Sequence, residues 1–148
     1  MRTGSGKKRV NIELLRRDLE LLDGHADEIG DVGSTPLESW SGDRTTRRAA
    51  ERLLQLWVGC LVSVAREVLR PTGPPLFFES DDAVKGLREQ AIVPDSLARK
   101  LRSVATVEHL VADRDETLTD QDVYERLQSV IKAHPKLLEA LIPFAQDA

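Results

Sequence analysis

Arg102 and His109 are the two residues whose types and spacing could support chemistry on a phosphate diester. Histidine serves as an acid or a base because it titrates near neutral pH, and arginine holds phosphate with a planar fork of donors. If both lie on one helix, a separation of seven positions returns them to nearly the same face, about two turns apart. Such a pair could bind phosphate, activate a ribose hydroxyl and protonate a leaving oxygen without a metal, but one phosphate reaches both residues only if the helix is distorted or a dimer partner contributes.

A basic run offers a second candidate site. Arg44, Arg47 and Arg48 stand close together at the start of a predicted helix, with Arg52 one turn further on. Such a run can bind RNA phosphate or an acidic protein partner, although a solvated helix face is the more common explanation for it. His25 lies among acids at spacings that also suit a solvated helix. No zinc-ligand spacing or phosphate-binding loop occurs, so we expect neither metal nor cofactor.

The composition favours a soluble helical protein with one domain. Of 148 residues, 41% are hydrophobic, 31% are charged and 4% are aromatic, so we expect a core of Leu, Val, Ile and Ala. The net charge of -4 argues against a general nucleic-acid coat protein but is compatible with a local basic patch. We expect a flexible basic segment over residues 1–9 and a helical domain over residues 10–148.

The sequence has no feature of secretion or membrane insertion. Its first residues lack the apolar stretch of a signal peptide, and the apolar run at 53–64 is too short to span a bilayer. The single cysteine, Cys60, gives no disulfide framework. Its apolar neighbours predict a buried thiol instead of a nucleophile. These features predict a cytoplasmic protein.

Apolar spacing predicts an antiparallel bundle of four to six helices. The first helix is expected over residues 10–29, with Gly30 as its stop, and the second from Arg44 to Leu69, capped by Asp43. Trp40 is expected to anchor the connection between these two helices. Shorter helices are expected over residues 81–90, from about residue 95 and after Thr119, with a break at His134-Pro135 before a last helix. No strand-like alternation occurs, so the predicted fold class is all-α.

Three segments resemble the HepT-like branch of the HEPN superfamily in order and spacing. They are ERLLQ at 51–55 with the apolar helix behind it, AIVP at 91–94 with its continuation over 97–102, and the stretch over 107–124. Each motif alone is short. Their order extends the resemblance over about residues 10–145, nearly the whole chain.

The resemblance implies a function as well as a fold. HepT-like proteins are dimeric all-α toxins in which an Arg and a His from each subunit meet at the dimer cleft and cut RNA. Their antitoxin is a minimal nucleotidyltransferase, which in some systems adds AMP to a Tyr two positions after the His. In an ungapped match, Glu108 stands for the family's Arg, His109 for its Asn, Asp113 for its His and Asp115 for its Tyr.

These replacements leave several hypotheses open. Glu108 reverses the charge that would face a phosphate, and Asp113 is ordinarily ionised at neutral pH. A shifted frame restores an Arg and a His as Arg102 and His109, within the looser spacing of the wider superfamily. The chain is then a toxin component that cuts RNA without a metal. The alternatives are a catalytically inactive HEPN binding or scaffold module, which acts through dimerisation and a protein partner, and a helical binding domain unrelated to RNA.

Overall fold

The structure is a computed structural model that describes residues 9–40, 42–73, 79–112 and 118–146, with the backbone alone for 107–112. Five α-helices account for most of this part of the chain, and no strand occurs within it. The helices are α1 (Ile12–Gly33), α2 (Arg44–Leu69), α3 (Ser80–Glu89), α4 (Asp95–Ala112) and α5 (Asp120–Leu141). Short 3-10 helices follow α1, α2 and α5; they are η1 (Leu37–Trp40), η2 (Arg70–Thr72) and η3 (Ile142–Ala145), respectively. The predicted all-α class is therefore confirmed.

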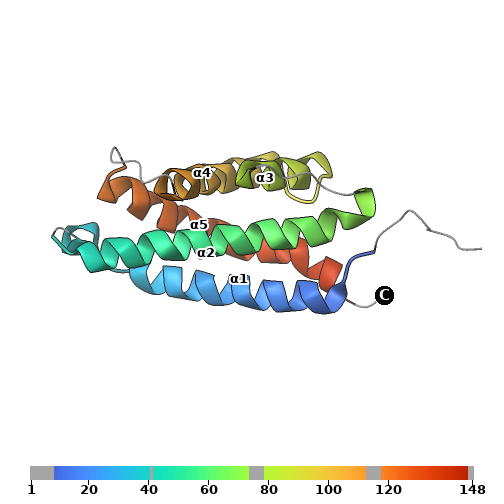
Figure 1. The fold of residues 1–148 in the computed structure, drawn as a ribbon, viewed down its shortest axis with the longest axis horizontal. Helices are drawn as coiled ribbons and strands as arrows, with labels where there is room; N and C mark the ends of the chain where they lie inside the picture. Colours follow the sequence, from blue (N-terminus) through green and yellow to red (C-terminus); the bar gives the residue numbers. More distant parts are fainter. Residues whose placement is uncertain (1–8, 41, 74–78, 113–117, 147–148) are drawn as a thin grey trace, which may run out of the picture.

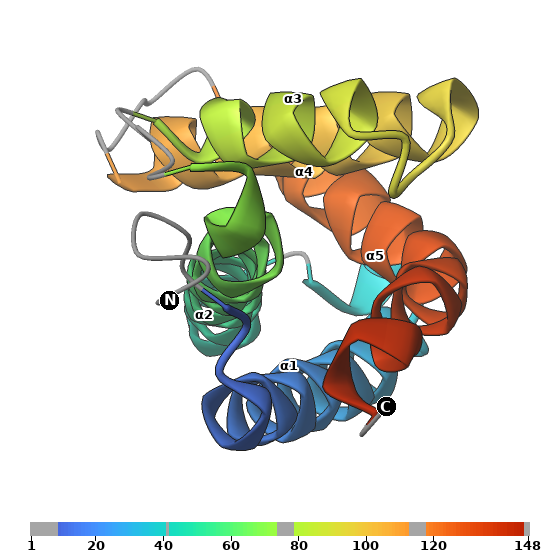
Figure 2. The ribbon, with the colours of Figure 1, turned by 90° about the vertical axis from the view of Figure 1, so that its right-hand side faces the viewer.

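The helices enclose one apolar core. In Figure 1, α1 and α2 run alongside each other for most of the length of the molecule, with α5 behind them. Figure 2 looks nearly along α1 and α2, and there α3 and α4 run side by side across the top. The start of α2, the end of α4 and the start of α5 all lie at one end of the bundle (Figure 1). Candidate residues on α2 and α4 are thus carried towards the same end.

Local capping residues set the starts of the long helices. The side chain of Asp43 accepts a hydrogen bond from the Thr46 amide at 3.1 Å, as predicted for α2. Thr119 accepts from the Asp122 amide, also at 3.1 Å, and Asp122 accepts in return from the Thr119 amide at 2.9 Å. This reciprocal arrangement is a capping box, which satisfies two amides that the first turn of α5 leaves unpaired.

Two predicted helix boundaries were wrong. α1 continues through Gly30 to Gly33, because its last turn packs on α5, where Gln128 donates to the Gly33 carbonyl at 2.7 Å. α5 continues through Pro135, which had been expected to end it. His134, Leu137 and other buried side chains on both sides of the proline pack into the core. That packing outweighs the lost amide donor and the steric cost of the ring.

Aromatic side chains join the connections to the core. Trp40 is 1% exposed and packs edge-on against Tyr124 of α5, with ring centroids 5.5 Å apart, which confirms its predicted anchoring role. Trp57 of α2 donates its indole hydrogen to His134 Nδ1 at 3.2 Å. Because that nitrogen accepts, His134 Nε2 carries the hydrogen that is donated to Asp23 of α1, at 2.8 Å. The hydrogen-bonded chain Trp57–His134–Asp23 therefore links α2, α5 and α1.

Two buried carboxylates lie between α1 and α2. Glu67 accepts hydrogen bonds from the Asn11 amide and from Arg70, and thereby holds the start of α1 against the end of α2. Burial raises the pKa of Asp18; the positive charge of neighbouring Arg17 opposes this effect, and the negative charge of Glu67 adds to it. Asp18 thus has an environment that disfavours its ionised form.

Candidate functional site

Arg102 lies near the middle of α4, where it faces the start of α3. Its Nε donates to Asp81 Oδ1 at 2.8 Å and its Nη2 donates to Asp81 Oδ2 at 3.4 Å. The Arg102 side chain is 46% exposed and that of Asp81 is 26% exposed. A phosphate could reach the guanidinium from solvent, but it would have to compete with a carboxylate that already occupies two donors.

The charges around Asp81 stabilise this contact. Burial alone would raise the pKa of Asp81, but the hydrogen bonds and charges of Arg102 and Lys85 outweigh it and hold the pKa below its ordinary value. Lys85 Nζ lies 3.4 Å from Asp81 Oδ2. Asp81 is therefore ionised at neutral pH and forms ion pairs with both Arg102 and Lys85. Sequence reasoning missed this residue as the partner of Arg102.

The other motif residues are only partly described. The backbone of α4 includes Glu108 and His109. Arg102 and His109 therefore lie on one continuous helix, which the prediction from their spacing had assumed. A separation of seven positions places them on nearly the same side of that helix, about two turns apart. Asp113 and Asp115, the remaining positions of the ungapped match, lie outside the described residues.

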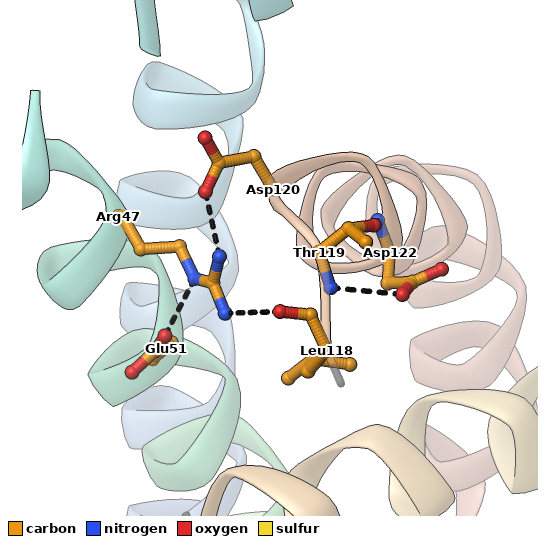
Figure 3. A network of polar contacts seen from close by, with 6 residues as sticks. All are labelled: Arg47, Glu51, Leu118, Thr119, Asp120 and Asp122. Carbon is orange, nitrogen blue, oxygen red and sulfur yellow. Dashed lines mark hydrogen bonds and ion pairs between the residues drawn. The ribbon is translucent and has the colours of Figure 1, made fainter. Parts of the chain in front are cut away.

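Arg47 holds the start of α5 against α2. As Figure 3 shows, its guanidinium contacts three acceptors: Glu51 Oε2 at 2.6 Å, Asp120 Oδ1 at 2.6 Å and the Leu118 carbonyl at 2.9 Å. Burial alone would lower the pKa of Arg47, but the hydrogen bonds to Asp120 and Glu51 outweigh it and raise the pKa. With its donors used in this way, Arg47 positions the chain next to the capping box of Thr119.

Arg44 and Arg48 differ from Arg47 in exposure and in contacts. Both side chains are exposed on α2, as is that of Arg52. Within the described ranges, none of the three forms an ion pair or a hydrogen bond through its side chain. Because they recur every four residues, they form one row with a spacing of about 6 Å along the helix. We call Arg44, Arg48 and Arg52 the α2 arginine row.

No histidine side chain that the structure describes belongs to a metal-binding arrangement. His134 is 7% exposed, and both of its ring nitrogens are used by Trp57 and Asp23, so its role is structural. Across the described residues, no group of three or more His, Cys, Asp or Glu side chains is arranged to hold a metal ion. Cys60 is half-buried, and burial together with the charge of Asp18 raises the pKa of its thiol, which disfavours the nucleophilic thiolate.

The profiles of known protein families give no match to this sequence, and a comparison with curated proteins gives none either. Of the helices that the structure describes, none combines the length and the hydrophobicity needed to cross a bilayer.

Proposed function

We propose that this chain is a dimeric HepT-like HEPN protein, the homologue of a toxin component, and that it acts in the cytoplasm by binding a minimal nucleotidyltransferase partner rather than by cutting RNA. The all-α fold and the segment order of the resemblance support the family part of the proposal. The contact between Arg102 and Asp81 carries the functional part, because the arginine of the restored motif has an intramolecular carboxylate as its ligand.

Electrostatics support the same choice. Catalysis on RNA requires donors aimed at the phosphate, and their loss slows such reactions by orders of magnitude. In the ungapped frame, three motif positions carry Glu108, Asp113 and Asp115. In the shifted frame, Arg102 must first leave Asp81, whose carboxylate would then stay near the incoming phosphate with only Lys85 to balance its charge. Both frames oppose RNA binding at the motif.

The α2 arginine row is the surface we propose for partner binding. Arg44 and Arg48 are exposed and have no acidic neighbour within bonding distance in the described chain, so an acidic surface could dock without displacing an internal contact. Exposed charges of this kind steer association and set its salt dependence. The adjacent Arg47 is engaged in the fold and is not part of the proposed surface.

The test is whether the neighbouring reading frame encodes a minimal nucleotidyltransferase and whether that protein binds this chain directly. Isothermal titration should give a complex whose affinity falls about tenfold or more in Arg44→Glu/Arg48→Glu. Lys132→Glu, at an exposed position on α5, should leave the affinity unchanged. Sedimentation of the isolated chain should show a dimer. Absence of a complex with that protein, or equal affinity of all variants, would contradict the proposal.

RNA cleavage is the second candidate function, and one observation favours it. Arg102 and His109 lie on one helix at a spacing that brings them to the same side, and Arg102 remains accessible to solvent. Cleavage without a metal would require both residues. Arg99→Ala offers a matched control, because Arg99 is an exposed arginine on the same helix.

A further inference from the structure

A pocket opens between the first turns of α4 and the second half of α5. Its volume is about 380 Å³, and its lining includes Leu97, Lys100, Lys136, Glu139 and Ala140. This volume falls within the range of roughly 300–1,000 Å³ that is typical of small-molecule sites. Lys100 faces α5, whereas Arg102, two residues later, faces α3, so the pocket lies on a different side of α4 from the motif.

The polar lining of the pocket is cationic. Lys100 and Lys136 reach it from two different helices, and Glu139 is the acid that lines it. Neither lysine forms an ion pair with a carboxylate within the part of the chain that the structure describes. Two lysines against one glutamate leave an excess of one positive charge. This excess favours a monoanion over a cation or a multiply charged phosphate.

Apart from Ser96, the remaining lining is apolar. Leu97 is 4% exposed and belongs to the core cluster, and Pro94 and Ala140 lie beside it along the pocket. An apolar group placed there would cover carbon surface that now contacts water, which stabilises a complex in proportion to the area covered. The pocket therefore combines a cationic part with an apolar wall, an arrangement that suits an amphipathic ligand.

We propose that this pocket, between Lys100 of α4 and Lys136 of α5, binds a small monocarboxylate with an apolar body. The carboxylate lies between the two ammonium groups, and the apolar body lies against Leu97 and Ala140. The lysines are exposed and hydrated, so each contributes modestly and binding is expected in the millimolar range. The site is separate from the α2 arginine row, and its occupancy does not depend on the function proposed above.

Titration with octanoate, followed by two-dimensional amide NMR, tests this proposal. Octanoate should shift the amide signals of residues 94–100 and 136–140 in a saturable manner. Acetate, which lacks the apolar body, and octylammonium, which reverses the charge, should both shift them much less. Lys100→Ala and Lys136→Ala should each weaken octanoate binding about fivefold, the effect expected of one exposed charge pair. Lys132→Ala, on the same helix as Lys136, should bind octanoate like the wild type.

Three results would overturn the proposal. The first is a set of octanoate shifts located elsewhere in the molecule, and the second is octylammonium binding as tightly as octanoate. The third is unchanged affinity when Lys100 and Lys136 are replaced together. Because the three lysines are exposed, their variants are expected to fold, and the dispersion of the amide spectrum verifies this before each titration.

Discussion

Replacement of Arg47 tests whether its three contacts hold α5 against α2. In Arg47→Ala, Asp120 and the Leu118 carbonyl lose their charged donor, and so does Glu51 on α2 itself. Hydrogen bonds to charged groups are worth about 1.5–3 kcal/mol each, but exposed pairs within a helix contribute only about 0.3–0.5 kcal/mol. The side chains of Arg47 and Asp120 are 22% and 42% exposed, which weakens their pair by solvent screening.

From these contacts we expect Arg47→Ala to lower the free energy of unfolding by about 2–3 kcal/mol. Arg48→Ala is the matched control, because this exposed neighbour has no side-chain hydrogen bond or ion pair to lose within the described residues, and its change should stay within about 0.5 kcal/mol. Urea denaturation followed by circular dichroism measures both values. Equal losses in the two variants would refute the reasoning.

A double-mutant cycle isolates the contact between the two helices. Asp120 also lies in the first turn of α5, where its charge favours the helix end, so Asp120→Asn has an effect of its own. Combining it with Arg47→Ala cancels that effect and leaves the interaction energy of the pair. We expect a coupling energy of about 1 kcal/mol. A value indistinguishable from zero would show that the contact between Arg47 and Asp120 drawn in Figure 3 does not stabilise the protein.

Three further stability measurements test other parts of the fold. Asp18→Asn should stabilise the protein at pH 7 by up to about 1 kcal/mol. Because the pKa of Asp18 is raised, this gain should shrink as the pH falls through that pKa towards 3.8. A gain that does not change with pH would argue against the raised pKa. Gly24→Ala should stabilise α1 by about 0.5–1 kcal/mol, whereas Gly33→Ala should be less favourable, since its Cβ would lie 2.7 Å from Ile131; the opposite order would contradict this packing. His134→Ala should cost about 2–4 kcal/mol through lost hydrogen bonds and a cavity, and a near-neutral result would exclude a structural role for the Trp57–His134–Asp23 chain.

Local signals in the sequence predicted much of the helical framework. Asp43 caps the helix for which it was proposed, and Thr119 caps the helix that was expected to follow it, because a cap depends on amides only two or three residues away. Trp40 is buried as expected of a large aromatic residue between two helices. The errors at Gly30 and Pro135 share one cause. Both residues have poor helix propensity, and packing between α1 and α5 overrides it. Helix propensity alone cannot predict such packing between distant segments.

The partners of the arginines could not be predicted in the same way. Arg102 pairs with Asp81 across 21 positions, and Arg47 pairs with Asp120 across 73 positions. The chain contains 25 acidic residues, and nothing in composition or spacing selects one of them for a given arginine. The arginines in the run from 44 to 48 accordingly look alike in sequence, although Arg47 faces the bundle and its two neighbours face solvent.

An RNA cleavage assay on the purified wild-type chain tests the central claim most directly. We predict no cleavage in the presence of a chelator, and no difference among wild type, Arg102→Ala, His109→Ala and the Arg99→Ala control. Cleavage by the wild type that is lost in both Arg102→Ala and His109→Ala but retained in Arg99→Ala would contradict the account and establish an active ribonuclease.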